Sequence, residues 1–176
     1  MAEPQTTPPG ERVSAPPPAP GWRPGDDRAA GQLAVFGDRH PCSRVIARMA
    51  AQEQRHLEEF DRLIADRGVR PTLLQPVWNV AGHALGAVTA LMGPEAAMAC
   101  TAAVETEIDK HYSEQLRALG DDDPDLTETI AEFQAEELEH RDAAIAAGAE
   151  NAVGYPVLSA FIRAGCRAAI ALSKRI

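Results

Sequence analysis

The chain has 176 residues, a formal net charge of −9 and a pI near 5.0, and only 5% of its residues are aromatic. This length is most simply one domain, or one domain plus a tail, and it can bury a sizeable core. The acidic balance argues against a nucleic-acid binder, whose affinity depends on clustered Lys and Arg that neutralise phosphates. Alanine is abundant and runs of β-branched residues are scarce, which predicts an all-α fold.

Residues 1–27 hold eight of the fourteen prolines, including "APPPAP", and few residues that could build a core. We expect a disordered or polyproline-like tail there, followed by one domain over residues 28–176. Helical periodicity and Gly or Pro boundaries predict six helices in that domain. In chain order they are a short helix closed by Gly37, then 43–66, about 76 to 92, 94–119, about 124 to 147, and 156–174.

Three of these helices place ionisable side chains in the apolar stripe that should face the core. Glu53 and His56 lie in the stripe of 43–66, and Glu137 and His140 lie in that of 124–147. Glu105 is inward on 94–119, where Asp109 competes with Ile108 for the next inward position. Because an ionised group is costly to bury unpaired, these side chains need a common partner.

The two stripes share one motif, E-x-x-H, as "EQRH" at 53–56 and "ELEH" at 137–140. A spacing of three puts both side chains on one helix face, where a carboxylate and an imidazole can reach one metal ion. Paired motifs of this kind, with single Glu residues from other helices, are the ligand pattern of di-iron and di-manganese four-helix bundles. Mixed oxygen and nitrogen ligands suit redox-active iron, and the absence of Cys ligands disfavours structural zinc. Either motif alone could be an exposed helical pair; together with Glu105 they predict a metal site.

The chain resembles a family, the bacterial and mitochondrial demethoxyubiquinone hydroxylases, which are ferritin-like di-iron monooxygenases of ubiquinone biosynthesis. The resemblance runs from "AGQLAVFG" at 30–37 to the C-terminus and includes "MAAQEQRHLEEFDRLI", "ACTAAVETEIDKHYSEQL", "EELEH" and "AGCRAAIALSKRI". It implies two iron ions, dioxygen as co-substrate and an external reductant. The ligands that it implies are Glu53, His56, Glu105, Glu137 and His140, with Glu53 and Glu137 bridging the ions.

The resemblance also implies a role in electron transfer for His111 and Tyr112, although Tyr112 could equally be a core aromatic. The chain departs from the family at a sixth ligand, a Glu nine residues before the glycine that matches Gly31, where Trp22 stands. Nearby prolines would break the helix that should present this ligand. Asp26 and Asp109 are candidate substitutes.

Two main functions follow. The first is hydroxylation of a demethoxyubiquinol-type polyprenylated quinol with dioxygen. The second is a catalytically impaired quinone-binding component that interacts with other proteins of the ubiquinone biosynthetic assembly, because Trp22 replaces a ligand. Iron storage or another di-iron oxidation is less favoured, since it leaves the two apolar helices described next without a purpose.

A polyprenylated quinol resides in lipid, so an enzyme acting on it must reach the bilayer. The helix from about 76 to 92 has almost no charge, and its Trp78 suits a membrane interface. The last helix sets apolar residues against basic ones at 163, 167, 174 and 175, the pattern of a helix lying on anionic lipid. The alternative is an amphipathic helix packed on its own bundle. With no secretory signal apparent, we expect a peripheral protein on the cytoplasmic side of the cell membrane.

Overall fold

The computed structural model describes residues 24–70 and 72–175. Within them it contains α-helices, one short 3-10 helix and no strand, which confirms the all-α, ferritin-like bundle. The predicted tail lies largely outside the described residues. The elements are α1 (Pro24–Phe36), α2 (Ser43–Asp66), α3 (Gln75–Leu91), α4 (Pro94–Leu119), α5 (Pro124–Ala146), η1 (Ala149–Asn151) and α6 (Tyr155–Ser173).

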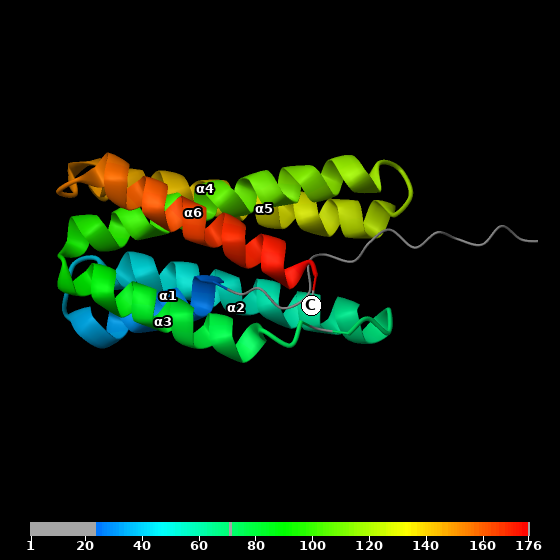
Figure 1. The fold of residues 1–176 in the computed structure, drawn as a ribbon, viewed down its shortest axis with the longest axis horizontal. Coiled ribbons are helices and arrows are strands. Elements are labelled where there is room, and N and C mark those ends of the chain that lie inside the picture. The colour runs from blue at the N-terminus through cyan, green and yellow to red at the C-terminus, as the bar shows by residue number, and fades with distance from the viewer. Residues whose placement is uncertain (1–23, 71, 176) are drawn as a thin grey trace, which may run out of the picture.

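The helices form two groups that lie side by side, with α1, α2 and α3 in one and α4, α5 and α6 in the other (Figure 1). α1 packs against α3 and α2, and α4 packs against α5 and α6. α2 meets α5 across the junction of the two groups. This junction is where the two E-x-x-H helices face each other.

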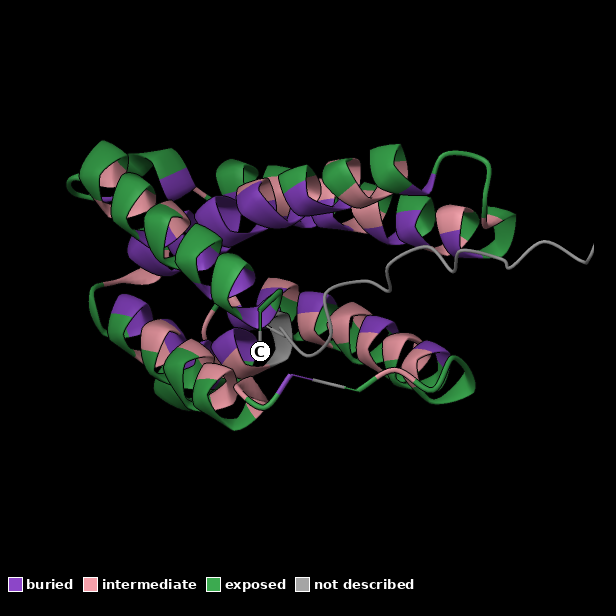
Figure 2. Cartoon of the chain, turned by 45° about the vertical axis from the view of Figure 1, so that its right-hand side comes forward, coloured by how far each residue is buried: buried purple, intermediate pink, exposed green. Residues whose placement is uncertain are grey.

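The core lies along the faces that the helices turn towards one another (Figure 2). α4 is the most deeply enclosed helix, because small residues such as Ala97, Ala99 and Cys100 let its neighbours approach closely. On α5 the buried residues repeat at steps of three and four, as the sequence predicted, and two of them are polar. They are Leu126, Ile130, Phe133, Glu137, His140 and Ala144.

Two glycines let α1 lie directly against α3. A Cβ added to Gly31 would come within 2.1 Å of the carbonyl oxygen of His83, and one added to Gly86 within 2.0 Å of the carbonyl oxygen of Arg28. Both obstacles are backbone atoms, so a side chain at either glycine would push the two helices apart. This contact fixes the position of α1 beside the junction.

We expect Gly86→Ala to destabilise the protein by about 2–3 kcal/mol, because the new methyl group can be accommodated only by moving the α1 backbone. Chemical denaturation followed by circular dichroism measures this change. The matched control is Gly165→Ala on α6, where no heavy atom lies within 4 Å of the added Cβ. Alanine is the better helix former, so the control should be neutral or gain up to about 1 kcal/mol. Equal effects at both positions would contradict the proposed close contact.

Candidate metal centre

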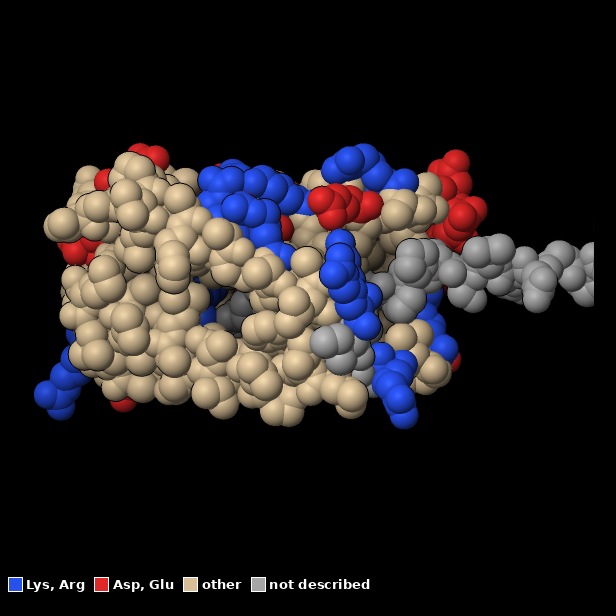
Figure 3. Space-filling view, viewed as in Figure 1, with Lys and Arg blue, Asp and Glu red and all other residues tan. Residues whose placement is uncertain are grey.

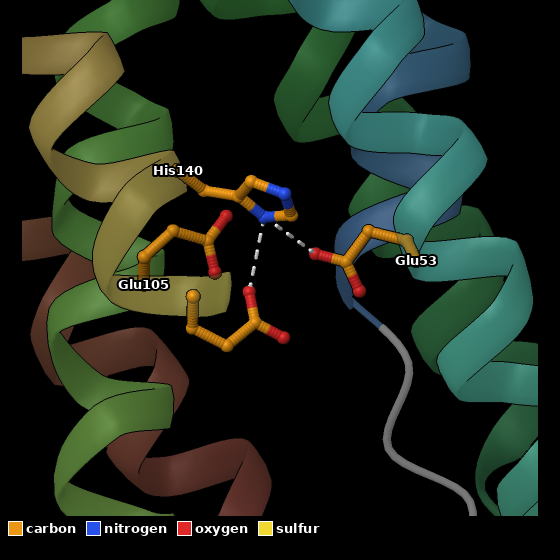
Figure 4. A group of neighbouring side chains, drawn as sticks. Glu53, Glu105 and His140 are labelled. Atoms are coloured by element: carbon orange, nitrogen blue, oxygen red, sulfur yellow. Dashed lines mark hydrogen bonds and ion pairs between the residues drawn. The ribbon is translucent and has the colours of Figure 1, made fainter. Parts of the chain in front are cut away.

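Four of the predicted ligands meet where α2 faces α4 and α5. One ligand atom from each of Glu53, Glu105, Glu137 and His140 lies within 4.8 Å of the others. Figure 4 shows Glu53 reaching in from α2 towards His140 and Glu105 on the opposite side. Glu105, Glu137 and His140 are at most 1% exposed, and the side chain of Glu53 is 11% exposed, so most of the cluster is shielded from bulk water.

The two histidines lie on either side of a pair of carboxylates. Nδ1 of His56 is 3.3 Å from Oε1 of Glu137 and 3.8 Å from Oε2 of Glu53. Nδ1 of His140 is 3.2 Å from Oε2 of Glu137 and 3.6 Å from Oε1 of Glu53. Each carboxylate therefore offers one oxygen to each histidine, an arrangement that suits two cations with Glu53 and Glu137 between them.

Each histidine is oriented by the opposite E-x-x-H helix. Nε2 of His56 lies 2.7 Å from Oε2 of Glu136 on α5, and Nε2 of His140 lies 3.1 Å from Oε1 of Gln52 on α2. Since these oxygens can only accept, each Nε2 carries the proton it donates and each Nδ1 is directed at the centre. Glu136 stands outside the apolar stripe of α5, and its contact with His56 was not predicted from the sequence. The sequence does show one shared feature of these two residues, since Gln52 and Glu136 each directly precede the Glu of an E-x-x-H motif.

Several buried atoms at the centre have no hydrogen-bond partner among the described residues. They include Oε1 of Glu53, Nδ1 of His56 and Oε2 of Glu105. Buried polar atoms are rarely left unsatisfied, and here the unsatisfied atoms are two carboxylate oxygens and an imidazole nitrogen. Such a donor set fits iron, so the residues present suit the metal that the sequence predicts.

The family model described as ubiquinone biosynthesis protein COQ7 matches residues 29–173. The chain belongs to this family. It is 56% identical over 146 residues to 3-demethoxyubiquinol 3-hydroxylase of Rhodospirillum rubrum, covering 83% of this chain and 69% of the relative. It is 50% identical over 151 residues to the mitochondrial NADPH-dependent 3-demethoxyubiquinone 3-hydroxylase of Homo sapiens, covering 84% and 69%. A 42% identity over 163 residues links it to the mitochondrial 5-demethoxyubiquinone hydroxylase of Saccharomyces cerevisiae, covering 84% and 70%. COQ7 relatives are thus named hydroxylases, and the chain is an enzyme of that class.

The sixth ligand that the resemblance implies has three candidate positions in this chain. Trp22 lies outside the described residues, as does the side chain of Asp26. Asp109 accepts a hydrogen bond of 2.6 Å at Oδ1 from the side-chain amide of Gln134 and is not part of the four-residue cluster. Asp109 is therefore engaged elsewhere in this structure.

A cation that sequence reasoning missed lies beside the cluster. Arg28 on α1 is 2% exposed, and its guanidinium donates to Oε1 of Glu105 and to the hydroxyl of Thr101, each at 2.5 Å. No periodic signal singles out Arg28, because its partners Thr101 and Glu105 lie on a different helix, α4.

The two residues predicted to serve electron transfer, His111 and Tyr112, have ring centroids 6.5 Å apart but different electrostatic surroundings. Tyr112 is buried, its ring centroid is 6.3 Å from that of Phe60, and burial followed by the charges of Glu137 and Glu53 raises its pKa. The pKa of His111 is lowered to about 4, first by burial and then by Lys174. The carboxylates of the cluster thus affect the pKa of Tyr112, whereas Lys174 at the end of α6 affects the pKa of His111.

In the absence of metal ions, protons on the two histidines supply the positive charge that balances the carboxylates. Burial opposes charge on His56 and His140, but Glu137 and Glu53 outweigh it and raise both pKa values to about 10. Burial likewise opposes ionisation of Glu53, yet the two histidines lower its pKa to about 2. Burial raises the pKa of Glu105 well above its usual value, and Arg28 works against that rise. Metal binding must therefore displace protons from both histidines.

We expect Glu136→Ala to weaken metal binding by about 10- to 100-fold, because it removes the acceptor that fixes the tautomer and orientation of His56. Titration of the metal-free protein with iron(II) or cobalt(II) measures this change. Glu132→Ala is the matched control, since Glu132 also contacts Arg55 but does not contact a histidine. Equal affinities in the two variants would show that Glu136 does not position His56.

The metal-free protein should lose stability as pH rises from 6.5 towards 10. In this window the unfolded chain has already released the protons that folded His56 and His140 still hold, so the free energy of unfolding falls. Denaturant titrations of chelator-treated protein across this range measure the slope. The double variant His56→Gln/His140→Gln should show a clearly smaller slope, and an unchanged slope would contradict the assignment.

Proposed function

We propose that this chain hydroxylates the ring of a demethoxyubiquinol-type polyprenylated quinol, with dioxygen as the oxygen donor. The names of the COQ7 relatives and the match over residues 29–173 support this proposal. The observation that carries it is the pair of carboxylates, Glu53 and Glu137, lying between His56 and His140. Such a site binds redox metal ions within a bundle that excludes water.

Glu53, His56, Glu105, Glu137 and His140 would hold the two iron ions that the resemblance implies, and Glu53 and Glu137 each present one oxygen to each histidine. When bound, iron supplies the activation of dioxygen that no side chain can provide. The protein holds each imidazole with Nδ1 towards the centre through Glu136 and Gln52. The Phe133 ring stacks 4.0 Å from His56, which keeps water from this side of the centre.

The reaction needs two electrons, since one atom of dioxygen enters the ring and the other leaves as water. We propose NADPH as their source, because the human, mouse and yet more distant relatives are named NADPH-dependent. Tyr112, buried beside Phe60 and sensitive to the cluster's charge, is the candidate residue on the route of these electrons.

A second part of the proposal is that α3 and α6 rest on a lipid bilayer. Within the described residues, α6 is the one helix whose length and composition would allow it to cross a membrane, and only 22% of that apolar window is buried. Large apolar side chains are exposed on both helices: Val77, Val80, Val88 and Leu91 on α3, and Val157, Phe161 and Leu172 on α6. Monomeric soluble proteins rarely expose so many large apolar side chains on neighbouring helices.

The two helices contact each other where the indole Nε1 of Trp78 on α3 donates to the hydroxyl of Ser173 on α6 at 2.9 Å. Figure 3 shows the face of the molecule that contains these helices as largely free of charge, with an opening in it and basic residues beside the opening. The charge pattern differs from the predicted one. Arg163 and Arg167 both contact Oε1 of the buried Glu107, at 2.7 and 3.2 Å. Apolar contact therefore carries more of the proposed membrane binding than those two arginines do.

The peripheral position on the cytoplasmic side of the cell membrane and the association with other ubiquinone-biosynthesis proteins belong to the same proposal. A catalytically impaired quinone-binding role is favoured by one observation, the Arg28 guanidinium on Glu105. Turnover separates it from the first function: bound quinol without hydroxylation would support the impaired role.

Glu137→Ala should abolish both tight iron binding and hydroxylation, because Glu137 provides an oxygen to each side of the centre. The measurements are iron content after anaerobic reconstitution and product formation from a short-chain demethoxyubiquinol. Glu139→Ala, on the exposed face of the same helix, is the control and should keep both properties. Full iron content in Glu137→Ala would mean that the ligand assignment is wrong.

Val157→Ser/Phe161→Ser should reduce co-flotation with liposomes by about tenfold or more, given that each buried apolar side chain contributes about 1.5–3 kcal/mol. Both side chains are more than three-quarters exposed, at 76% and 77%, so folding should be unaffected. Ile145→Ser, a partly exposed apolar position on α5, serves as the control. Unchanged flotation of the double variant would rule out α6 as a membrane contact.

A further inference from the structure

Arg28 is a permanent positive charge enclosed in the candidate metal centre. Two of its guanidinium nitrogens are engaged, one by Oε1 of Glu105 and one by Thr101, each at 2.5 Å. Arg28 and Glu105 are 2% and 0% exposed, so the pair is almost fully removed from water. Arginine does not give up its proton at any physiological pH, and this charge therefore persists whether or not metal ions are bound.

The backbone holds Arg28 in place. Its carbonyl oxygen lies where a Cβ of Gly86 would otherwise be, so α1 is pressed against α3 at this residue. The guanidinium then extends from α1 towards α4, where Glu105 and Thr101 lie one helical turn apart. A residue fixed at both ends in this way cannot easily withdraw when a metal ion arrives.

The described ligands serve the two cation positions unequally. Glu105 belongs to the same group of four as His140, so this position has three carboxylates within reach. Within the described residues, the carboxylates near Nδ1 of His56 are those of Glu53 and Glu137. The remaining oxygen of Glu105, Oε2, has no hydrogen-bond partner in the part of the chain that the structure describes, so it can bind a metal while Oε1 stays on Arg28.

The net charge of the site differs between the states with one and with two bound divalent ions. When a metal ion holds Glu53, Glu105 and Glu137 in their ionised forms, their three negative charges are neutralised by Arg28 together with a single divalent ion. A second divalent ion would leave excess positive charge in a site shielded from water, where uncompensated charge is costly. We infer that Arg28 takes over part of the electrostatic role of the second metal ion, so that the position beside His140 fills tightly and the position beside His56 fills weakly.

This inference rests on the proposed metal centre, and cobalt(II) titration of the full metal-free chain tests it. Absorption spectroscopy and calorimetry give the number and affinity of bound ions without any turnover. In the wild-type chain we expect one tight equivalent and a second at least about tenfold weaker. Arg28→Gln keeps a donor for Glu105 but removes the charge, and should tighten the second equivalent by at least about tenfold.

Two further variants separate charge from packing. Arg28→Lys keeps the charge without the planar fork and should retain the unequal affinities. Arg48→Gln removes the same charge from an exposed position on α2 and should match the wild-type chain. Two equal equivalents in the wild-type chain would overturn the inference whether or not any variant folds. So would a second equivalent that is unchanged in folded Arg28→Gln. If no chain bound cobalt at all, the metal centre itself would be refuted.

Discussion

The cost of enclosing three carboxylates at the junction of two helical groups determines how this protein is built. Glu53, Glu105 and Glu137 would repel one another in a site with little water, so positive charge has to be present among them. In the metal-free protein, protonated His56 and His140 supply it together with Arg28. Metal ions can replace the two histidine protons but cannot replace Arg28. The same cluster is therefore compatible with a folded bundle in both states, and this makes loading after folding feasible.

The ligands could be predicted from sequence because the information is local. A helix places residues three apart on one face, so Glu53 with His56 and Glu137 with His140 follow from the period of the apolar stripe. The ends of α2 and α4 were also predictable, at Ser43–Asp66 and Pro94–Leu119, since Gly and Pro flank them. The resemblance to a known family then indicated that these separate faces converge on one site.

The residues that sequence reasoning missed owe their roles to contacts between helices. Glu136 resembles its exposed neighbours Glu132 and Glu139 until α5 is docked against α2, where it meets His56. Arg28 looks like any arginine near a chain segment rich in Gly and Pro, and becomes a buried ion-pair partner only through the glycine contact of α1 with α3. The arginines of α6 were read as facing lipid because the sequence does not reveal that Glu107 lies beneath them.

The hydrogen bonds that orient the two histidines connect the two E-x-x-H helices to each other. Gln52 orients His140 and Glu136 orients His56, so each motif depends on the residue that precedes the other motif. A substitution at position 136 is felt first at position 56, some eighty residues earlier in the chain. The structure therefore couples position 52 with position 140 and position 136 with position 56, across the two E-x-x-H motifs. A change at either preceding residue thus alters the hydrogen bond of a histidine on the opposite helix.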